Sequence, residues 1–281
     1  MSEAAAHGDR WVGLEQVPDT GDMSNAFLEL PTHRLRYRVQ GADGAPWLVF
    51  CNSLGTDLSM WDAQAGAFAD RFRVLRYDRR GHGASTAAPG PYTLADLGGD
   101  VLALFDALGI ERAHYCGLSI GGLVAQWLAV HAPRRLARVA VCATASKIGT
   151  AEAWTTRIAD VQARGLDWMA GATAERWFGA SFRSMHAAEV DRILAGFVAT
   201  SVAGYAGCCA ALAGADLRAD IAGIDIPLLA ISGDDDPVCP PSDLQAIADT
   251  CGGRHVSLPG RHLVNVESPD AFNAALRDFL S

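Results

Sequence analysis

The chain lacks several features that would assign it to a particular class of protein. No run of about 18 or more consecutive apolar residues occurs, which excludes a single transmembrane helix. Residues 1 to 22 are polar and acidic and contain no apolar core of a secretory signal peptide. The seven cysteines include no CxxC pair and no Cys/His cluster at zinc-ligand spacing. We therefore expect a cytoplasmic protein with reduced thiols, no membrane partner and no bound metal.

Basic residues are also scarce. The 281 residues include 23 Lys and Arg against 32 Asp and Glu, which gives a net charge of −9. No basic face can dominate the electrostatic field of such a chain, so we expect no nucleic-acid partner. Half of the residues are hydrophobic, which excludes intrinsic disorder. Nothing in the composition indicates an oligomeric state.

Short apolar runs alternate with amphipathic stretches from Phe27 onward. Thr93 is the predicted N-cap of a helix that stops at Gly109, and Ser268 and Pro269 are predicted to open a C-terminal helix. Strands that alternate with helices indicate an α/β fold with a mostly parallel sheet. The apolar runs are continuous, as is typical of strands covered on both faces, and they span 47–51, 74–77, 114–116, 139–142, 228–231 and 255–258.

One block interrupts this alternation. Residues 147 to 218 contain only helix-like segments, rich in alanine and large aromatic side chains. We interpret this block as a helical lid inserted into an α/β core that comprises residues 27 to 146 and 219 to 281. Residues 1 to 26 show no hydrophobic periodicity and are expected to form a loose leader.

The segment from Gly117 to Gly122 carries a candidate nucleophile. It reads GLSIGG, follows the apolar run that ends at Cys116 and opens a helical pattern. Flanking glycines allow a tight strand-to-helix turn that holds Ser119 exposed at the top of a sheet. A glycine-rich turn with an incidental serine is the alternative. A serine hydroxyl becomes nucleophilic only beside a base that an acid orients.

Candidates for the acid and the base follow two later strands. The run 228–231 leads into three adjacent aspartates, and the run 255–258 leads to His262. We choose Asp236 because it precedes a proline in a turn that can direct its carboxylate toward His262. Asp234 and Asp235 are interpreted as turn or solvent residues. Open α/β sheets place their sites just beyond such strand ends.

The anion that develops on an attacked carbonyl needs backbone donors. The N–H of Ile120, directly after Ser119, is one candidate. The N–H of Leu54, in the polar segment that follows the run 47–51, is the other, although an ordinary polar turn would have the same composition.

At this point the chain resembles the α/β-hydrolase superfamily, in which nucleophile, acid and base follow one another in the order Ser119, Asp236 and His262. His82 precedes Ser119 in the chain, whereas this order places the base last, so His82 is interpreted as a turn residue. Within the superfamily the resemblance is to the 3-oxoadipate enol-lactonases, with Asn52-Ser53 where many members have His-Gly. The segments that carry the resemblance are 52–57, 60–62, 77–83, 117–122, 147–150 with Ala153 and Trp154, 204–209 and 262–267.

The resemblance implies hydrolysis of a five-membered enol-lactone with a free acetate arm, giving 3-oxoadipate, without a cofactor. Because this substrate is an anion and the protein is negative, a local cation must pair with its carboxylate. We favour Arg157, which lies on one helix face with Trp154, over Lys147 and over Arg176 beside Trp177. Packing of the lid onto the core is the alternative role for both tryptophans. The remaining alternatives for the protein are another esterase, lactonase or perhydrolase with the same triad, or a non-catalytic binding protein.

Overall fold

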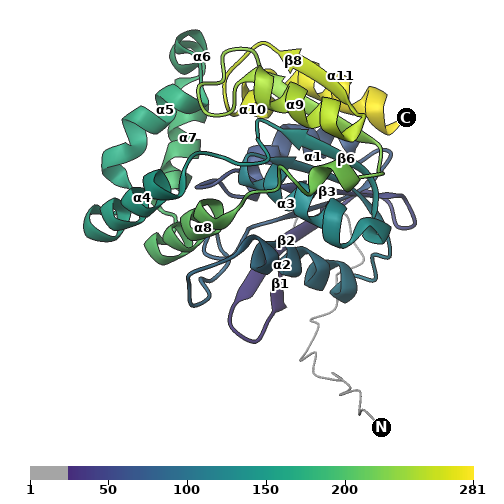
Figure 1. Ribbon diagram of the computed structural model, residues 1–281, viewed down its shortest axis with the longest axis horizontal. Helices are drawn as coiled ribbons and strands as arrows, with labels where there is room; N and C mark the ends of the chain where they lie inside the picture. Colours follow the sequence, from purple (N-terminus) through teal and green to yellow (C-terminus); the bar gives the residue numbers. More distant parts are fainter. Residues whose placement is uncertain (1–24) are drawn as a thin grey trace.

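A computed structural model describes residues 25 to 281, and an eight-stranded sheet forms its centre (Figure 1). The strand order is β1-β2-β4-β3-β5-β6-β7-β8, with antiparallel pairing of β1, β2 and β4 at one edge and parallel pairing elsewhere. The strands are β1 (Ala26–Glu29), β2 (Arg34–Gln40), β3 (Trp47–Cys51), β4 (Arg73–Tyr77), β5 (Ala113–Leu118), β6 (Leu136–Cys142), β7 (Leu228–Gly233) and β8 (Arg254–Leu258).

All six strands predicted from continuous apolar runs are confirmed, with ends that differ by up to three residues. Strands β1 and β2 were not predicted. They form the antiparallel end of the sheet, with β1 at the edge and β2 between β1 and β4, and β2 alternates basic and apolar residues because only one of its faces is buried. Of the expected leader, residues 1 to 24 lie outside the described part of the chain, and Ala26 already belongs to β1.

Helices cover the sheet on both faces. Helices α1 and α11 pack against each other, and α2 packs against α3. The bounds are α1 (Asp62–Phe68), α2 (Leu94–Ala107), α3 (Ile120–His131), α9 (Pro241–Cys251), α10 (Val264–Glu267) and α11 (Pro269–Leu280).

The predicted helix caps have different outcomes. Thr93 does cap α2, because its hydroxyl oxygen accepts the N–H of Asp96 at 3.1 Å while the Asp96 carboxylate accepts the N–H of Thr93 at 2.7 Å. Ser268 precedes α11 as predicted but does not cap it through its side chain. Its hydroxyl donates instead to the carbonyl of Pro259 at 2.6 Å, since that turn lies within reach.

Between β6 and β7 the chain forms a group of helices that lies to one side of the sheet, at the left of Figure 1. Its longest members, α4 and α8, pack against each other. We retain residues 147 to 218 as the proposed extent of the lid. The helices are α4 (Ala151–Arg164), α5 (Ala170–Trp177), α6 (Ala180–Met185), α7 (Ala187–Val198) and α8 (Val202–Gly214).

Within residues 25 to 281, no single helix has the length and apolar character needed to cross a membrane. Helices α7 and α8 reach that length and composition only when taken together across an 89° bend.

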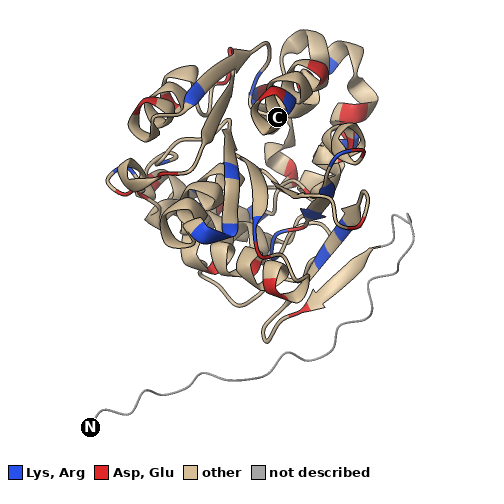
Figure 2. Cartoon of the chain, turned by 90° about the vertical axis from the view of Figure 1, so that its right-hand side faces the viewer, with Lys and Arg blue, Asp and Glu red and all other residues tan. Residues whose placement is uncertain are grey.

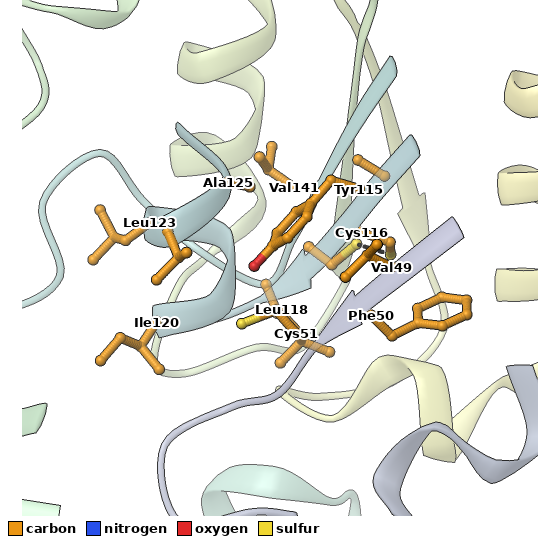
Figure 3. Close-up of a cluster of buried hydrophobic side chains, with 14 of the residues drawn as sticks. Val49, Phe50, Cys51, Tyr115, Cys116, Leu118, Ile120, Leu123, Ala125 and Val141 are labelled. Carbon is orange, nitrogen blue, oxygen red and sulfur yellow. Dashed lines mark hydrogen bonds between the residues drawn. The ribbon is translucent and has the colours of Figure 1, made fainter. Parts of the chain in front are cut away.

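The central strands are anchored by a continuous hydrophobic core. Phe50 of β3, Tyr115 and Cys116 of β5 and Val141 of β6 are all buried, and Ala125 of α3 belongs to the same cluster (Figure 3). Figure 2 shows basic and acidic residues interspersed along the outer elements. Burial of this many apolar side chains holds the carboxyl ends of the parallel strands in fixed positions.

Candidate active site

Ser119 occupies the sharp turn between β5 and α3. Its backbone has φ 60° and ψ −122°, a conformation that residues with a Cβ rarely adopt. Several hydrogen bonds hold it there: its N–H donates to Cys142 at 2.8 Å, and its carbonyl accepts from the Thr144 hydroxyl at 2.7 Å and the Gly122 N–H at 2.8 Å. The surroundings therefore impose a strained conformation on the one residue of the turn that carries a hydroxyl.

The glycines that flank Ser119 are required by close backbone approaches. A Cβ on Gly117 would lie 2.1 Å from the carbonyl oxygen of Gly121. A Cβ on Gly121 would lie 2.4 Å from the carbonyl oxygen of Cys51 in β3. The predicted reason for the GLSIGG pattern, space for a tight turn against the sheet, is therefore met at both positions.

His262 and Asp236 meet between the loops that follow β8 and β7. Nδ1 of His262 lies 2.9 Å from Oδ2 of Asp236, and both side chains are buried. Oδ1 of Asp236 accepts the N–H groups of Val238 at 2.8 Å and Cys239 at 3.2 Å. The carboxylate is thus fixed by the turn that carries it, and it leaves Nε2 of His262 available to a hydroxyl.

The two neighbouring aspartates, interpreted above as turn or solvent residues, are exposed and also make contacts that were not predicted. Asp234 accepts the N–H of Gly260 at 2.9 Å, and Asp235 pairs with the Nε of Arg261 at 2.7 Å. Both carboxylates connect the loop after β7 to the loop after β8. His82 is buried, with Nδ1 3.2 Å from the carbonyl of Arg80, which is consistent with its interpretation as a turn residue.

The two predicted anion donors lie beside the candidate nucleophile. Within residues 25 to 281, neither the N–H of Leu54 nor that of Ile120 donates to a protein acceptor. The loop that carries Leu54 is held from beneath by the buried Arg79, whose guanidinium donates to the carbonyls of Asn52 and Ser53. These contacts leave both N–H groups available for a developing oxyanion.

A cavity of about 180 Å³ joins the residues from the core and from the lid. From the core, Ser119 and His262 line it together with Leu54, which belongs to the loop after β3. Its lining, in chain order, is Ser53, Leu54, Ser119, Ile148, Trp154, Arg157, Thr173, Arg176, Trp177, Phe197, Tyr205, Leu212, Val238 and His262.

Two arginines of the lid line this cavity, Arg157 from α4 and Arg176 from α5. Among the ion pairs of residues 25 to 281, neither guanidinium has a carboxylate partner. Arg176 donates to the hydroxyl of Thr173 at 3.0 Å. Burial, and then the charge of Arg157, lower the pKa of Arg176 below its ordinary value. Two cations that repel each other in a half-buried space favour an anionic ligand.

The other predicted lid residues divide into two groups. Trp154 and Trp177 both line the cavity and both also make structural contacts. The Nε1–H of Trp154 donates to the carbonyl of Ile148 at 2.6 Å, and the ring of Trp177 packs edge-on against Phe197. Lys147 does not join them, because it pairs with Asp216 at 3.0 Å and is absent from the cavity lining among the described residues.

Sequence reasoning missed Thr173 and Tyr205, which are buried residues of the lid and line the cavity. Burial, with Cys209 nearby, raises the pKa of Tyr205 to about 12, so its hydroxyl stays a neutral donor. Tyr205 belongs to the segment 204–209 used above for the resemblance, and that segment was the only signal for it. In residues 25 to 281 no group of three or more His, Cys, Asp or Glu side chains could hold a metal ion.

Comparisons with known proteins identify the family to which this fold belongs. A family model for the alpha/beta hydrolase fold matches residues 46–269. The chain is 44% identical to 3-oxoadipate enol-lactonase 2 of Acinetobacter baylyi over 86% of this chain and 91% of the relative.

Two solved structures are similar over nearly the whole described chain. A hydrolase from Pseudomonas aeruginosa is 46% identical, with a TM-score of 0.89 over 92% of this chain and 98% of that one. An enol-lactonase from Burkholderia xenovorans is 44% identical, with a TM-score of 0.89 over 90% of this chain and 99% of that one. The chain therefore belongs to the α/β-hydrolase family, within its group of 3-oxoadipate enol-lactonase relatives, and it is an enzyme of the hydrolase class.

Proposed function

We propose that this hydrolase opens 3-oxoadipate enol-lactone, a five-membered enol-lactone with a carboxylate arm, to 3-oxoadipate in the degradation of aromatic compounds. The observation that carries the proposal is the pair of guanidiniums, Arg157 and Arg176, that line one cavity with Ser119 and His262 and have no carboxylate partner in residues 25 to 281. A neutral ester would not need them. The names of the relatives, which are 3-oxoadipate enol-lactonases, support the same substrate.

Ser119 acts as the nucleophile. Its Oγ attacks the lactone carbonyl while Nε2 of His262 takes the hydroxyl proton, and Asp236 stabilises the resulting imidazolium through Nδ1. The N–H groups of Leu54 and Ile120 donate to the carbonyl oxygen as it becomes an oxyanion. The carbonyl then re-forms, the bond to the ring oxygen breaks, and the leaving enolate takes the proton from Nε2 of His262, becomes an enol and tautomerises to the ketone, which returns His262 to its neutral form. The opened chain remains attached to Ser119 as an ester.

Water completes the reaction. His262 removes a proton from a water molecule, which attacks the Ser119 ester; the C–Oγ bond breaks and Oγ regains its proton from His262. The product carries two carboxylates, the arm that was present in the lactone and the one that hydrolysis creates. Arg157 is the main partner of the arm, with Trp154 on the same face of α4 beside it, and Arg176 binds the same carboxylate from α5.

The proposal is tested by the ratio of kcat/KM for freshly generated 3-oxoadipate enol-lactone to that for neutral p-nitrophenyl acetate. We expect the ratio to reach several orders of magnitude and both activities to be lost in Ser119→Ala. Equal or better turnover of the neutral ester, lost in the same variant, would keep Ser119 as nucleophile but identify a general esterase, and the substrate assignment would be wrong.

A further inference from the structure

The two oxygens of the Glu267 carboxylate each accept a backbone N–H, one from the lid and one from the loop that carries His262. Oε1 accepts the N–H of Gly179 at 3.0 Å, at the junction of α5 and α6 in the lid. Oε2 accepts the N–H of Arg261, the residue before His262, at 2.9 Å. Glu267 has no Lys, Arg or His partner among the ion pairs of residues 25 to 281. The carboxylate of Glu267 therefore interacts mainly with these two backbone N–H groups.

Glu267 does not contact the reacting groups. It is absent from the lining of the cavity that contains Ser119, as far as residues 25 to 281 are concerned. It lines a separate cavity of about 240 Å³ instead, together with Phe182 and Asn265. Any effect of Glu267 on the reaction must therefore act through the groups that it holds.

Two further bonds join the same two segments, the lid residues 175–179 and the loop residues 260–267. The guanidinium of Arg261 donates to the carbonyl of Glu175, and the N–H of Leu263 donates to the carbonyl of Trp177 at 3.1 Å. In the lid, the bonded residues Glu175 and Trp177 are the two chain neighbours of Arg176. In the loop, the bonded residues Arg261 and Leu263 are the two chain neighbours of His262.

We infer that Glu267 is a positioning residue that sets the distance between the anion-binding Arg176 and the base His262, so that a carboxylate bound at the lid places the susceptible carbonyl at Ser119. The inference rests on the proposed function in that it takes Arg176 to bind a carboxylate. The physical reason is that a bidentate carboxylate fixes two N–H groups relative to one another, and charge-assisted bonds are about twice as strong as neutral ones. A misplacement of about 1 Å can cost on the order of a hundredfold in rate.

The variant Glu267→Gln tests this assignment. The amide keeps one acceptor oxygen but directs its NH2 group at the second N–H, so that one of the two bonds is lost. Ser268→Ala is the matched control, because Ser268 anchors the same loop to the Pro259 carbonyl and not to the lid. Two readouts are used: kcat for p-nitrophenyl acetate, which reports on His262, and the inhibition constant of adipate against that ester, which reports on the arginines.

We expect Glu267→Gln to lower kcat for the ester about tenfold and to weaken adipate inhibition about tenfold, whereas Ser268→Ala changes neither. Arg176→Ala should weaken adipate inhibition as well. Because Glu267 acts through Arg176, adding Glu267→Gln to Arg176→Ala should weaken inhibition no further, which a merely structural role would not produce. Full additivity in the double variant, or equal effects of Glu267→Gln and Ser268→Ala, would overturn the inference.

A second variant approaches the same contact from the lid. In Gly179→Ala the new Cβ would lie 2.8 Å from Oε1 of Glu267 and push the two segments apart. We expect the same pair of effects, so that the inference remains testable if Glu267→Gln does not fold. Neither assay uses the enol-lactone, so failure to turn over that substrate would contradict the proposed substrate alone. Absence of adipate inhibition in the unaltered protein would contradict both the anion site and its coupling to His262.

Discussion

Nδ1 of His262 lies 2.9 Å from Oδ2 of Asp236, although the two residues follow different strands. The contact forms because β7 and β8 are parallel neighbours, so their carboxyl ends open at the same edge of the sheet. The turn after β7 presents three aspartates there, and the backbone of Val238 and Cys239 directs only Asp236 at the histidine.

This arrangement predicts different effects for neighbouring aspartates. Asp236→Asn should lower kcat by on the order of 10⁴-fold, because an amide at this position favours the wrong tautomer of His262. Asp235→Asn, which alters an exposed ion pair with Arg261, should change kcat only a few-fold. Steady-state kinetics on the lactone or on p-nitrophenyl acetate would check both. Comparable losses in the two variants would show that the acid is misassigned.

Removal of the Ser119 hydroxyl should abolish turnover while leaving the fold intact. We expect Ser119→Ala to lower kcat by on the order of 10⁴-fold or more. The circular dichroism spectrum should be unchanged, since the hydroxyl bears no structural hydrogen bond among those of residues 25 to 281. A loss of tenfold or less would remove Ser119 as the nucleophile.

The strained backbone at Ser119 makes a separate prediction about stability. Glycine adopts φ 60° without a Cβ clash, so Ser119→Gly should be more stable than Ser119→Ala by about 1 kcal/mol. Urea denaturation of the two inactive proteins measures the difference in the free energy of unfolding. A glycine variant of lower stability than the alanine variant would indicate that the turn is relaxed around the serine.

The carboxylate arm of the substrate should depend on Arg157. We expect Arg157→Ala to raise KM for the enol-lactone about tenfold or more and to change kcat/KM for p-nitrophenyl acetate little. Lys147→Ala is the matched control, because Lys147 pairs with Asp216 away from the cavity lining. If both substrates responded equally to Arg157→Ala, Arg157 would not be the carboxylate partner.

His82 should make the protein sensitive to acid. Burial, with the charge of Arg79, lowers the pKa of His82 from 6.5 to about 3. Between these values the unfolded chain binds a proton that the folded chain does not, so stability falls as the pH falls, by about 1.4 kcal/mol per pH unit. Between pH 7 and pH 5 the unaltered protein should lose about 2 kcal/mol more than His82→Gln. Urea denaturation at the two pH values measures this, and parallel losses would contradict it.

Much of the fold could be read from local patterns. Continuous apolar runs identified the buried parallel strands, because strands covered on both faces have no polar side to present. Strand β2, which lies between β1 and β4 in the antiparallel part of the sheet, escaped this criterion because its alternating residues Arg34 to Gln40 bury one face only. Ser119, Asp236 and His262 were recognisable because each lies in the turn or loop that follows a predicted strand.

Features whose interacting residues lie within a few positions of one another are specified locally: the turn around Ser119, the cap at Thr93 and the common face of Trp154 and Arg157 on α4. Contacts between distant segments were decided by the tertiary structure. It brought Arg176, Thr173 and Tyr205 into the cavity, paired Lys147 with Asp216 and joined Glu267 to the lid. The physical reason is that helix and strand periodicity is local, whereas the packing of the lid against the sheet depends on side chains far apart in the chain.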